Sequence, residues 1–263
     1  MESTIALIGF GEAGFTFARA ASWPSGTFAF DIDASRVPMI TDCGITPAAS
    51  AEEALADADI VLSLVTADSA PLVAADYAPF LKSGALFCDM NSIAPQTKQA
   101  NAKAVNATGA RYVDVAVMAP VDPAALNVPL LIAGPDAAEA ETALNAMGFA
   151  KTRVVGDAIG RASAIKMIRS VMVKGLEALT WECAAAADEA GVFDEVMASL
   201  DASEKHQPWA TRIAYNRERM ETHGIRRAAE MEESAKTLSG FGVEPVMTRG
   251  TVIRQRQAAK PRI

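Results

Sequence analysis

Short apolar runs alternate with longer amphipathic stretches through the first half of the chain. The runs are rich in Val, Ile, Leu and Phe and are bounded by Gly, Asn or Asp, as buried β-strands are. Strands of this kind are predicted at 4–10, 27–33, 59–65, 85–91, 111–117 and 128–134. Stretches between them, such as 48–58 and 95–109, have the composition of helices. Strands that alternate with helices predict βαβ units and a largely parallel sheet that is covered on both faces.

The pattern changes near residue 156. From 160 to 190 there is no proline and a single internal glycine, and Gly191 then provides a stop. A helix of this length is about 45 Å long. Further helices are predicted at 192–203, 209–224 and 225–242. We therefore predict an α/β domain over 1–158 and an all-helical domain over 159–263, which begins with the long helix.

Composition narrows the class of protein. The net charge at pH 7 is −8, whereas a nucleic-acid-binding protein is expected to be basic. No apolar run has the length of a membrane span, and the N-terminus carries acid rather than base, so neither a membrane protein nor a secreted one is expected. The cysteines are scattered and form no CxxC pair, which indicates reduced thiols in the cytoplasm. The chain has only 2 histidines, and no metal site is predicted.

The first predicted strand leads into a glycine-rich turn and then a helix. This is the strand–turn–helix context in which a G-x-G-x-x-G pattern binds a dinucleotide, although the same turn also occurs in α/β folds that bind none. The glycines let the backbone approach a pyrophosphate, and the helix N-terminus supplies free N–H groups. The predicted cofactor-binding residues of this turn are Gly9, Phe10, Gly11, Glu12, Ala13 and Gly14.

Asp31 ends the second predicted strand. A carboxylate at this position accepts hydrogen bonds from the adenosine ribose and repels a 2′-phosphate, so we predict NAD as the cofactor. Because the nearby Arg36 is able to pair with a phosphate, NADP is not excluded.

The long predicted helix has a polar side. At about 100° per residue, Lys166, Ser170 and Lys174 fall on one side, and apolar residues cover the other side, which is expected to be packed. The polar side is either solvated or lines a site, and the pattern alone leaves both readings open.

Four segments together resemble the β-hydroxyacid dehydrogenase superfamily, which includes 3-hydroxyisobutyrate and 6-phosphogluconate dehydrogenases. They are GFGEAG, DMNSIAP at 89–95, VDVAVMAP at 113–120 and KMIRSVMVKG at 166–175. The likeness covers nearly the whole chain and is greatest to a 6-phosphogluconate dehydrogenase-like branch with its own C-terminal domain. It implies a Rossmann-type dinucleotide-binding domain followed by a helical domain, a site between the two, and pairing into a homodimer through the helical domain.

The resemblance also implies roles for two loops. In DMNSIAP the small polar pair contacts substrate and cofactor, which assigns Asn91 and Ser92, although an ordinary Asn–Ser turn is the alternative. The loop that holds Val65 and Thr66 is expected to run past the nicotinamide end of the cofactor.

The segment VDVAVMAP departs from the family. Relatives have Ser-Gly-Gly around the substrate carboxylate, whereas this chain has Met118, Ala119 and Pro120 at these substrate-binding positions. The pocket is therefore expected to be more apolar than in relatives, or to bind a different acid group.

Lys166 corresponds to the family's catalytic lysine, in a pattern G-x-x-x-K-x-x-x-N that this chain matches loosely from Gly160. Ser170 replaces the asparagine and is predicted to orient lysine or substrate. Hydride transfer to or from a hydroxyl-bearing carbon needs a group that takes or returns the hydroxyl proton, and Lys166 is assigned this role. Lys174 suits either a distal anion of the substrate or a surface ion pair.

Two residues of the last helices complete the predicted site. Relatives place a lysine where this chain has Ala229, so Arg227 is predicted to bind substrate in its place, together with His223. The alternative is an exposed helix with ion pairs such as Arg226–Glu230. The resemblance and these residues predict hydride exchange between NAD(P) and a small acidic substrate, a hydroxy acid or its oxo form. An imine reductase and a non-catalytic NAD-binding protein stay open as alternatives.

Overall fold

The computed structural model describes residues 3–24, 26–204 and 207–259. The chain forms two compact units, Met1–Arg169 and Ser170–Ile263. The sequence predicted a boundary between 158 and 159, whereas contacts divide the chain inside the long helix α7 (Arg161–Ala190). The first turns of this helix, including Lys166, therefore belong to the first unit.

The first unit is built on an eight-stranded sheet with the order β3-β2-β1-β4-β5-β6-β7-β8. All neighbouring strands are parallel except β6 and β7, which are antiparallel. The strands are β1 (Ile5–Ile8), β2 (Phe28–Phe30), β3 (Thr46–Pro47), β4 (Ile60–Ser63), β5 (Leu86–Asp89), β6 (Arg111–Val117), β7 (Leu130–Ala133) and β8 (Thr152–Gly156). The predicted α/β fold is confirmed. The sequence missed β3, which has two residues, and β8, which has exposed positions and no buried run.

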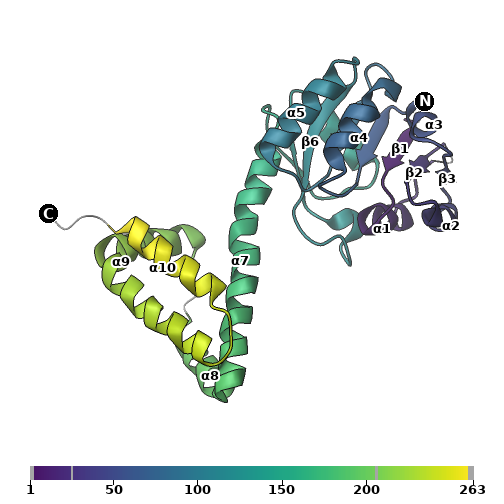
Figure 1. The fold of residues 1–263 in the computed structure, drawn as a ribbon. Helices are drawn as coiled ribbons and strands as arrows, with labels where there is room; N and C mark the ends of the chain where they lie inside the picture. The colour runs from purple at the N-terminus through teal and green to yellow at the C-terminus, as the bar shows by residue number, and fades with distance from the viewer. Residues whose placement is uncertain (1–2, 25, 205–206, 260–263) are drawn as a thin grey trace. The chain divides into compact units, whose positions relative to one another are not determined.

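Helices cover both faces of this sheet. They are α1 (Glu12–Ala20), α2 (Val37–Asp42), α3 (Ala51–Leu55), α4 (Ala70–Asp76), α5 (Pro95–Asn106) and α6 (Ala137–Ala146), with short 3₁₀ turns at Ala34–Arg36, Ala78–Phe80 and Ala125–Asn127. Figure 1 shows α4 and α5 side by side over the sheet. Successive residues of β1 face opposite layers, because Ile5 and Leu7 pack in one buried cluster and Ala6 and Ile8 in the other.

The strand order places a switch point between β1 and β4. The chain leaves β1 toward β2 on one side, whereas β4 begins the other half of the sheet. Loops that follow β1 and β4 diverge at their carboxyl ends, and ligands of open α/β sheets bind in the crevice that this creates. The loop after β5 ends at the same edge of the sheet because β4 and β5 are parallel neighbours.

The second unit is helical. It contains the rest of α7 and three more helices: α8 (Phe193–Ser203), α9 (Trp209–Gly240) and α10 (Val246–Ala258). The two pieces predicted at 209–224 and 225–242 are a single helix, and α10 was not predicted. Helices α9 and α10 lie side by side (Figure 1). The small residues Gly224 and Ala228 are buried in α9.

The apolar side of α7 is not packed as the sequence predicted. Val171 is 72% exposed and Leu179 is 42% exposed. Among the residues that the structure describes, no helix combines the length and the apolar character that crossing a bilayer requires.

Glu182 joins α7 to the start of α10 within the second unit. Its buried carboxylate accepts hydrogen bonds from the backbone N–H groups of Met247 at 2.7 Å and Thr248 at 2.9 Å, and from the Thr248 hydroxyl at 2.6 Å. These N–H groups lie in the first turn of α10, where they have no partner within the helix. Burial alone would raise the pKa of Glu182, but the hydrogen bonds from Thr248 and Met247 outweigh it, so the pKa lies below its ordinary value of 4.5.

Replacing this carboxylate should destabilise the protein. Glu182→Gln is expected to lower the free energy of unfolding by about 1–3 kcal/mol near neutral pH, because charged hydrogen bonds to the α10 terminus are lost. A lowered pKa in the folded state gives stability that is present above the ordinary value of 4.5 and is lost as the pH falls through the lower folded value. The difference between wild type and variant should therefore shrink in acid. Denaturant unfolding at several pH values measures it, with Glu177→Gln on the exposed side of α7 as the control. A difference that stays constant into acid would contradict the role of the charge.

Candidate active site

The glycine turn after β1 has the geometry that a pyrophosphate cradle needs. Gly9 has φ +94°, and a Cβ there would lie 2.6 Å from the carbonyl oxygen of Leu64, so only glycine fits. At Gly11 a Cβ would meet nothing within 4 Å, which leaves the backbone open on the outer side of the turn. Helix α1 begins directly afterwards at Glu12. Its free N–H groups and positive dipole end suit an anion at this position.

Asp31, after β2, holds the glycine turn in place. One carboxylate oxygen accepts a hydrogen bond from the Phe10 N–H at 2.6 Å, and the other accepts one from the Asp33 N–H at 2.9 Å. Arg36 is paired with Asp33, with its Nε 3.3 Å from the carboxylate. A hydrogen bond from Ser35 is the main reason that the pKa of Asp33 lies below its usual range.

A hollow of about 250 Å³ opens beside this turn. Its walls include Gly9, Gly11, Asp31, Arg36, Thr66 and Tyr77, so it joins the loops after β1, β2 and β4. Two carboxylates at the end of β2 make this wall unfavourable for an additional phosphate, and Arg36 is already partnered by Asp33. The residues present fit a dinucleotide, and the position of its adenosine end beside Asp31 stays a prediction.

The loop after β4 is tied to the loop after β5 through Asn91. The buried Asn91 side chain accepts a hydrogen bond from the Val65 N–H at 2.7 Å and donates one to the Ser63 hydroxyl at 2.9 Å. Thr66 is exposed, and its hydroxyl donates to the Ser69 hydroxyl at 3.0 Å. Asn91 thus fixes the position of the Val65–Thr66 loop, and its contact with substrate stays a prediction.

Ser92 and Lys166 lie together. The Lys166 ammonium donates a hydrogen bond to the Ser92 hydroxyl oxygen over 2.6 Å. Ser92 is exposed and Lys166 is half-buried, so the pair is accessible at the carboxyl edge of the sheet. The sequence predicted both residues on separate segments, and the fold brings them into contact.

The segment after β6 lies next to a cation that sequence reasoning missed. The Arg169 guanidinium donates to the Met118 carbonyl oxygen over 3.4 Å. Met118 is half-buried, whereas Ala119 and Pro120 are exposed. The spacing of Arg169 from Lys166 could have identified it, because residues three apart are neighbours on the surface of a helix.

The other predicted substrate residues belong to the second unit. Ser170 and Lys174 are on α7, with Ser170 half-buried and Lys174 exposed. His223 and Arg227 are half-buried on α9, and Arg226 pairs with Glu230 on that helix. The approach of these four residues to Lys166, which belongs to the first unit, stays a prediction.

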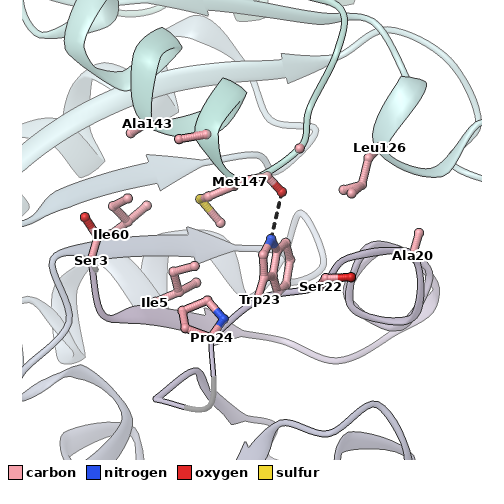
Figure 2. A pocket seen from close by; sticks show the side chains of 12 residues that line it. Ser3, Ile5, Ala20, Ser22, Trp23, Pro24, Ile60, Leu126, Ala143 and Met147 are labelled. Carbon is pink, nitrogen blue, oxygen red and sulfur yellow. Dashed lines mark hydrogen bonds between the residues drawn. The ribbon is translucent and has the colours of Figure 1, made fainter. Parts of the chain in front are cut away.

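A second hollow, of about 550 Å³, lies at the opposite edge of the sheet (Figure 2). Ile5 and Ile60, the first residues of β1 and β4, line it. The Trp23 indole N–H crosses it to the Met147 carbonyl oxygen at 2.9 Å. None of its lining residues is ionisable. This hollow therefore offers no group for proton transfer, in contrast to the carboxyl edge, where Lys166 and Ser92 meet.

Comparison with known proteins supports this assignment of the first unit. Residues 4–156, more than half of the chain, match the family described as the NAD binding domain of 6-phosphogluconate dehydrogenase. The chain belongs to this family. Residues 187–258, within the helical unit, match a domain of unknown function, DUF1932. The first unit is therefore an NAD-binding domain and the predicted cofactor, NAD(P), is confirmed at the level of the family, whereas the residues assigned to its site stay a prediction.

Solved structures agree on the fold. A conserved hypothetical protein from Sinorhizobium meliloti is 37% identical, with a TM-score of 0.65 over 97% of this chain and 88% of that chain. A conserved protein of unknown function, described as similar to 3-hydroxyacid dehydrogenases, is 26% identical, with a TM-score of 0.61 over 97% and 96%. An imine reductase from Myxococcus stipitatus in complex with NADP⁺ is 18% identical, with a TM-score of 0.78 over 97% and 93%, and shows likeness of fold alone.

The acidic end of β2 generates a prediction about cofactor choice. The wild-type protein is expected to bind NADH more tightly than NADPH, because a 2′-phosphate would lie beside Asp31 and Asp33. Asp31→Asn should reduce this preference by about tenfold, or about 1.4 kcal/mol, as one of the charges is removed. Titration of cofactor fluorescence measures both affinities. Asp42→Asn, an exposed carboxylate on α2, is the matched control. Equal or tighter binding of NADPH by the wild type would contradict the prediction.

Proposed function

We propose that this protein is an NAD-preferring oxidoreductase that exchanges hydride between the nicotinamide and a hydroxy acid or its oxo form. The observation that carries the proposal is the 2.6 Å contact between Lys166 Nζ and Ser92 Oγ. It brings a proton-carrying group to the carboxyl edge of an NAD-binding sheet, against Ser92, which directly follows Asn91 in the chain. Groups at this edge are those that contact ligands in open α/β folds.

The roles of the two side chains follow from their chemistry. Bound NAD(H) supplies or accepts the hydride at this site. As an amine, Lys166 takes the proton from the substrate hydroxyl during oxidation, and as an ammonium it returns the proton to the carbonyl oxygen during reduction. The Ser92 hydroxyl accepts a hydrogen bond from Lys166 and has its own O–H to donate, so it can orient lysine and substrate together.

Arg169 supports an acid as the substrate. Relatives surround the substrate carboxylate with Ser-Gly-Gly, and this chain lacks both the hydroxyl and the glycines at Met118–Pro120. Arg169 contacts this segment at the Met118 carbonyl, and a guanidinium binds carboxylates through paired N–H groups. The Arg169 guanidinium beside Met118 would bind the substrate carboxylate in place of the Ser-Gly-Gly segment of relatives.

Imine reduction is the second candidate. The exposed Ala119–Pro120 segment is apolar, and solved imine reductases share this fold. In that reaction the Lys166 ammonium would protonate the imine nitrogen or hold the substrate, and no carboxylate site would be needed.

A substrate panel separates these functions. Hydroxy acids and sugar acids with NAD⁺, and oxo acids and cyclic imines with NADH, are followed by the absorbance of the reduced nicotinamide. We expect turnover of hydroxy acids and of the corresponding oxo acids. Turnover of cyclic imines alone would select the second candidate. Tight NADH binding with no absorbance change on any compound would show a non-catalytic NAD-binding protein.

Lys166 should be required for turnover and not for cofactor binding. Lys166→Met is expected to lower kcat by about 10²–10⁴-fold, the usual contribution of general acid–base catalysis. The Kd for NADH should change little, because Gly9, Gly11 and Asp31 carry the cofactor site. Lys103→Met, an exposed lysine on α5, controls for the loss of one surface charge. Near-normal turnover by Lys166→Met on an established substrate would exclude the proposed role.

A further inference from the structure

Two carboxylates from neighbouring strands face one buried ammonium beneath the candidate site. Asp89 at the end of β5 and Asp114 in β6 are directly paired in register. Lys98, from α5, lies with its Nζ 3.0 Å from Asp89 Oδ1 and 3.4 Å from Asp114 Oδ1. The side chains of all three are at most 1% exposed. Adjacent like charges in a sheet repel, and the Lys98 ammonium lies between the two carboxylates, where its charge offsets that repulsion.

Asp89 fixes the loop that carries Ser92. Its Oδ1 accepts a hydrogen bond from the Asn91 N–H at 3.0 Å, and Lys98 also donates to the Asp89 carbonyl oxygen. Its Oδ2 accepts from the Tyr112 hydroxyl at 2.6 Å. Burial and the nearby carboxylate of Asp89 raise the pKa of Tyr112, which keeps it a neutral donor. The conformation of the loop just before Ser92 thus depends on the Asp89 carboxylate.

Asp114 fixes the start of the helix that carries Lys166. Its Oδ2 accepts hydrogen bonds from the N–H groups of Gly160 at 3.0 Å and Ser163 at 3.1 Å. A carboxylate at this position binds N–H groups that have no partner within α7 and complements the helix dipole. Gly160 has φ +95°, and a Cβ there would come within 3.1 Å of Pro95, so the helix start and the end of the loop are in close contact.

Each carboxylate therefore holds one of the two segments that bring Lys166 and Ser92 together. Asp89 holds the loop with Ser92, Asp114 holds the turn before Lys166, and Lys98 joins the two carboxylates. A shift of either element would lengthen the contact between Lys166 Nζ and Ser92 Oγ, and the cost of misplaced catalytic groups is steep. If Lys98 only stabilised the fold through its ion pairs, the contact between Lys166 and Ser92 would not depend on it.

We propose that Lys98 is a positioning residue, which bridges Asp89 and Asp114 and thereby sets the contact between Lys166 and Ser92. Its effect on turnover rests on the proposed function, whereas its effect on the Lys166 amine does not. The reactivity of that amine reports on the contact, because the hydrogen bond that Nζ donates to Ser92 Oγ restricts the orientation of Nζ toward a reagent.

The decisive variant is the double change Lys98→Met with Asp114→Asn. The single change Lys98→Met leaves two buried carboxylates without a cation and is expected to unfold much of the protein. The double change leaves only the Asp89 charge, and the new amide oxygen can still accept from Gly160 and Ser163. The bridge is then broken with one buried carboxylate left without a cation instead of two. Lys82→Met with Asp59→Asn, at an exposed pair with Nζ and Oδ1 2.5 Å apart, is the matched control.

The readout is the rate of acetylation of Lys166 as a function of pH, measured on the full chain by peptide mass spectrometry, with Lys103 as internal reference. Ser92→Ala defines the rate after loss of the contact. We expect the double variant to differ from wild type by about threefold or more and to match Ser92→Ala, with no further change when the substitutions are combined. The control pair should match wild type.

Wild-type acetylation of Lys166 in the folded double variant would overturn the proposal, as would a Ser92→Ala profile equal to wild type. Should the double variant fail to fold, Asp114→Asn alone decides, since it leaves a balanced Lys98–Asp89 pair and weakens the bridge on the helix side. A wild-type profile for that variant would also overturn the proposal. Absence of turnover on every substrate would refute the proposed reaction and leave the acetylation result standing.

Discussion

The architecture of the first unit depends on an ammonium group that has been taken out of water. Lys98 is fully buried, and its ammonium lies against oxygen atoms of β5 and β6. The cost of removing such a group from water is large, and it is recovered only where all of its partners are correctly placed. The strand register that pairs Asp89 with Asp114 is thus tied to the position of α5 on the sheet. A shift of one residue in either strand would turn a carboxylate away from Lys98.

The parallel sheet explains why the polar groups of the candidate active site lie at one edge. Buried parallel strands have apolar faces, and their loops are the places where functional side chains are accommodated. Gly9, Thr66 and Ser92 follow three neighbouring strands and therefore meet at one edge. Lys166 reaches this edge because the first turns of α7 belong to the same compact unit. The opposite edge, near Trp23 and Met147, has a larger hollow but an uncharged lining.

Elements with a local sequence pattern could be predicted, whereas features that depend on the pairing of distant segments could not. The strand runs, the glycine turn and the long helix were predictable because each leaves a contiguous signature. The strand β8 was missed because its residues are partly exposed, and α10 because its composition is polar. Lys98 was missed for a different reason. A lysine within a polar predicted helix is expected to be solvated. The two carboxylates that bind it come together only through the register of β5 against β6, which pairs Asp89 with Asp114.

The bracing of the glycine turn by Asp31 has a consequence for how a dinucleotide associates. The Phe10 N–H is already hydrogen-bonded to Asp31, and Gly9 is confined by the Leu64 backbone. The turn is therefore ordered before any ligand arrives, and little backbone entropy remains to be lost on association. A preorganised loop of this kind lets the pyrophosphate gain its contacts without a folding step. Discrimination between cofactors then falls to the side chains around the ribose, while the backbone recognises what all of them share.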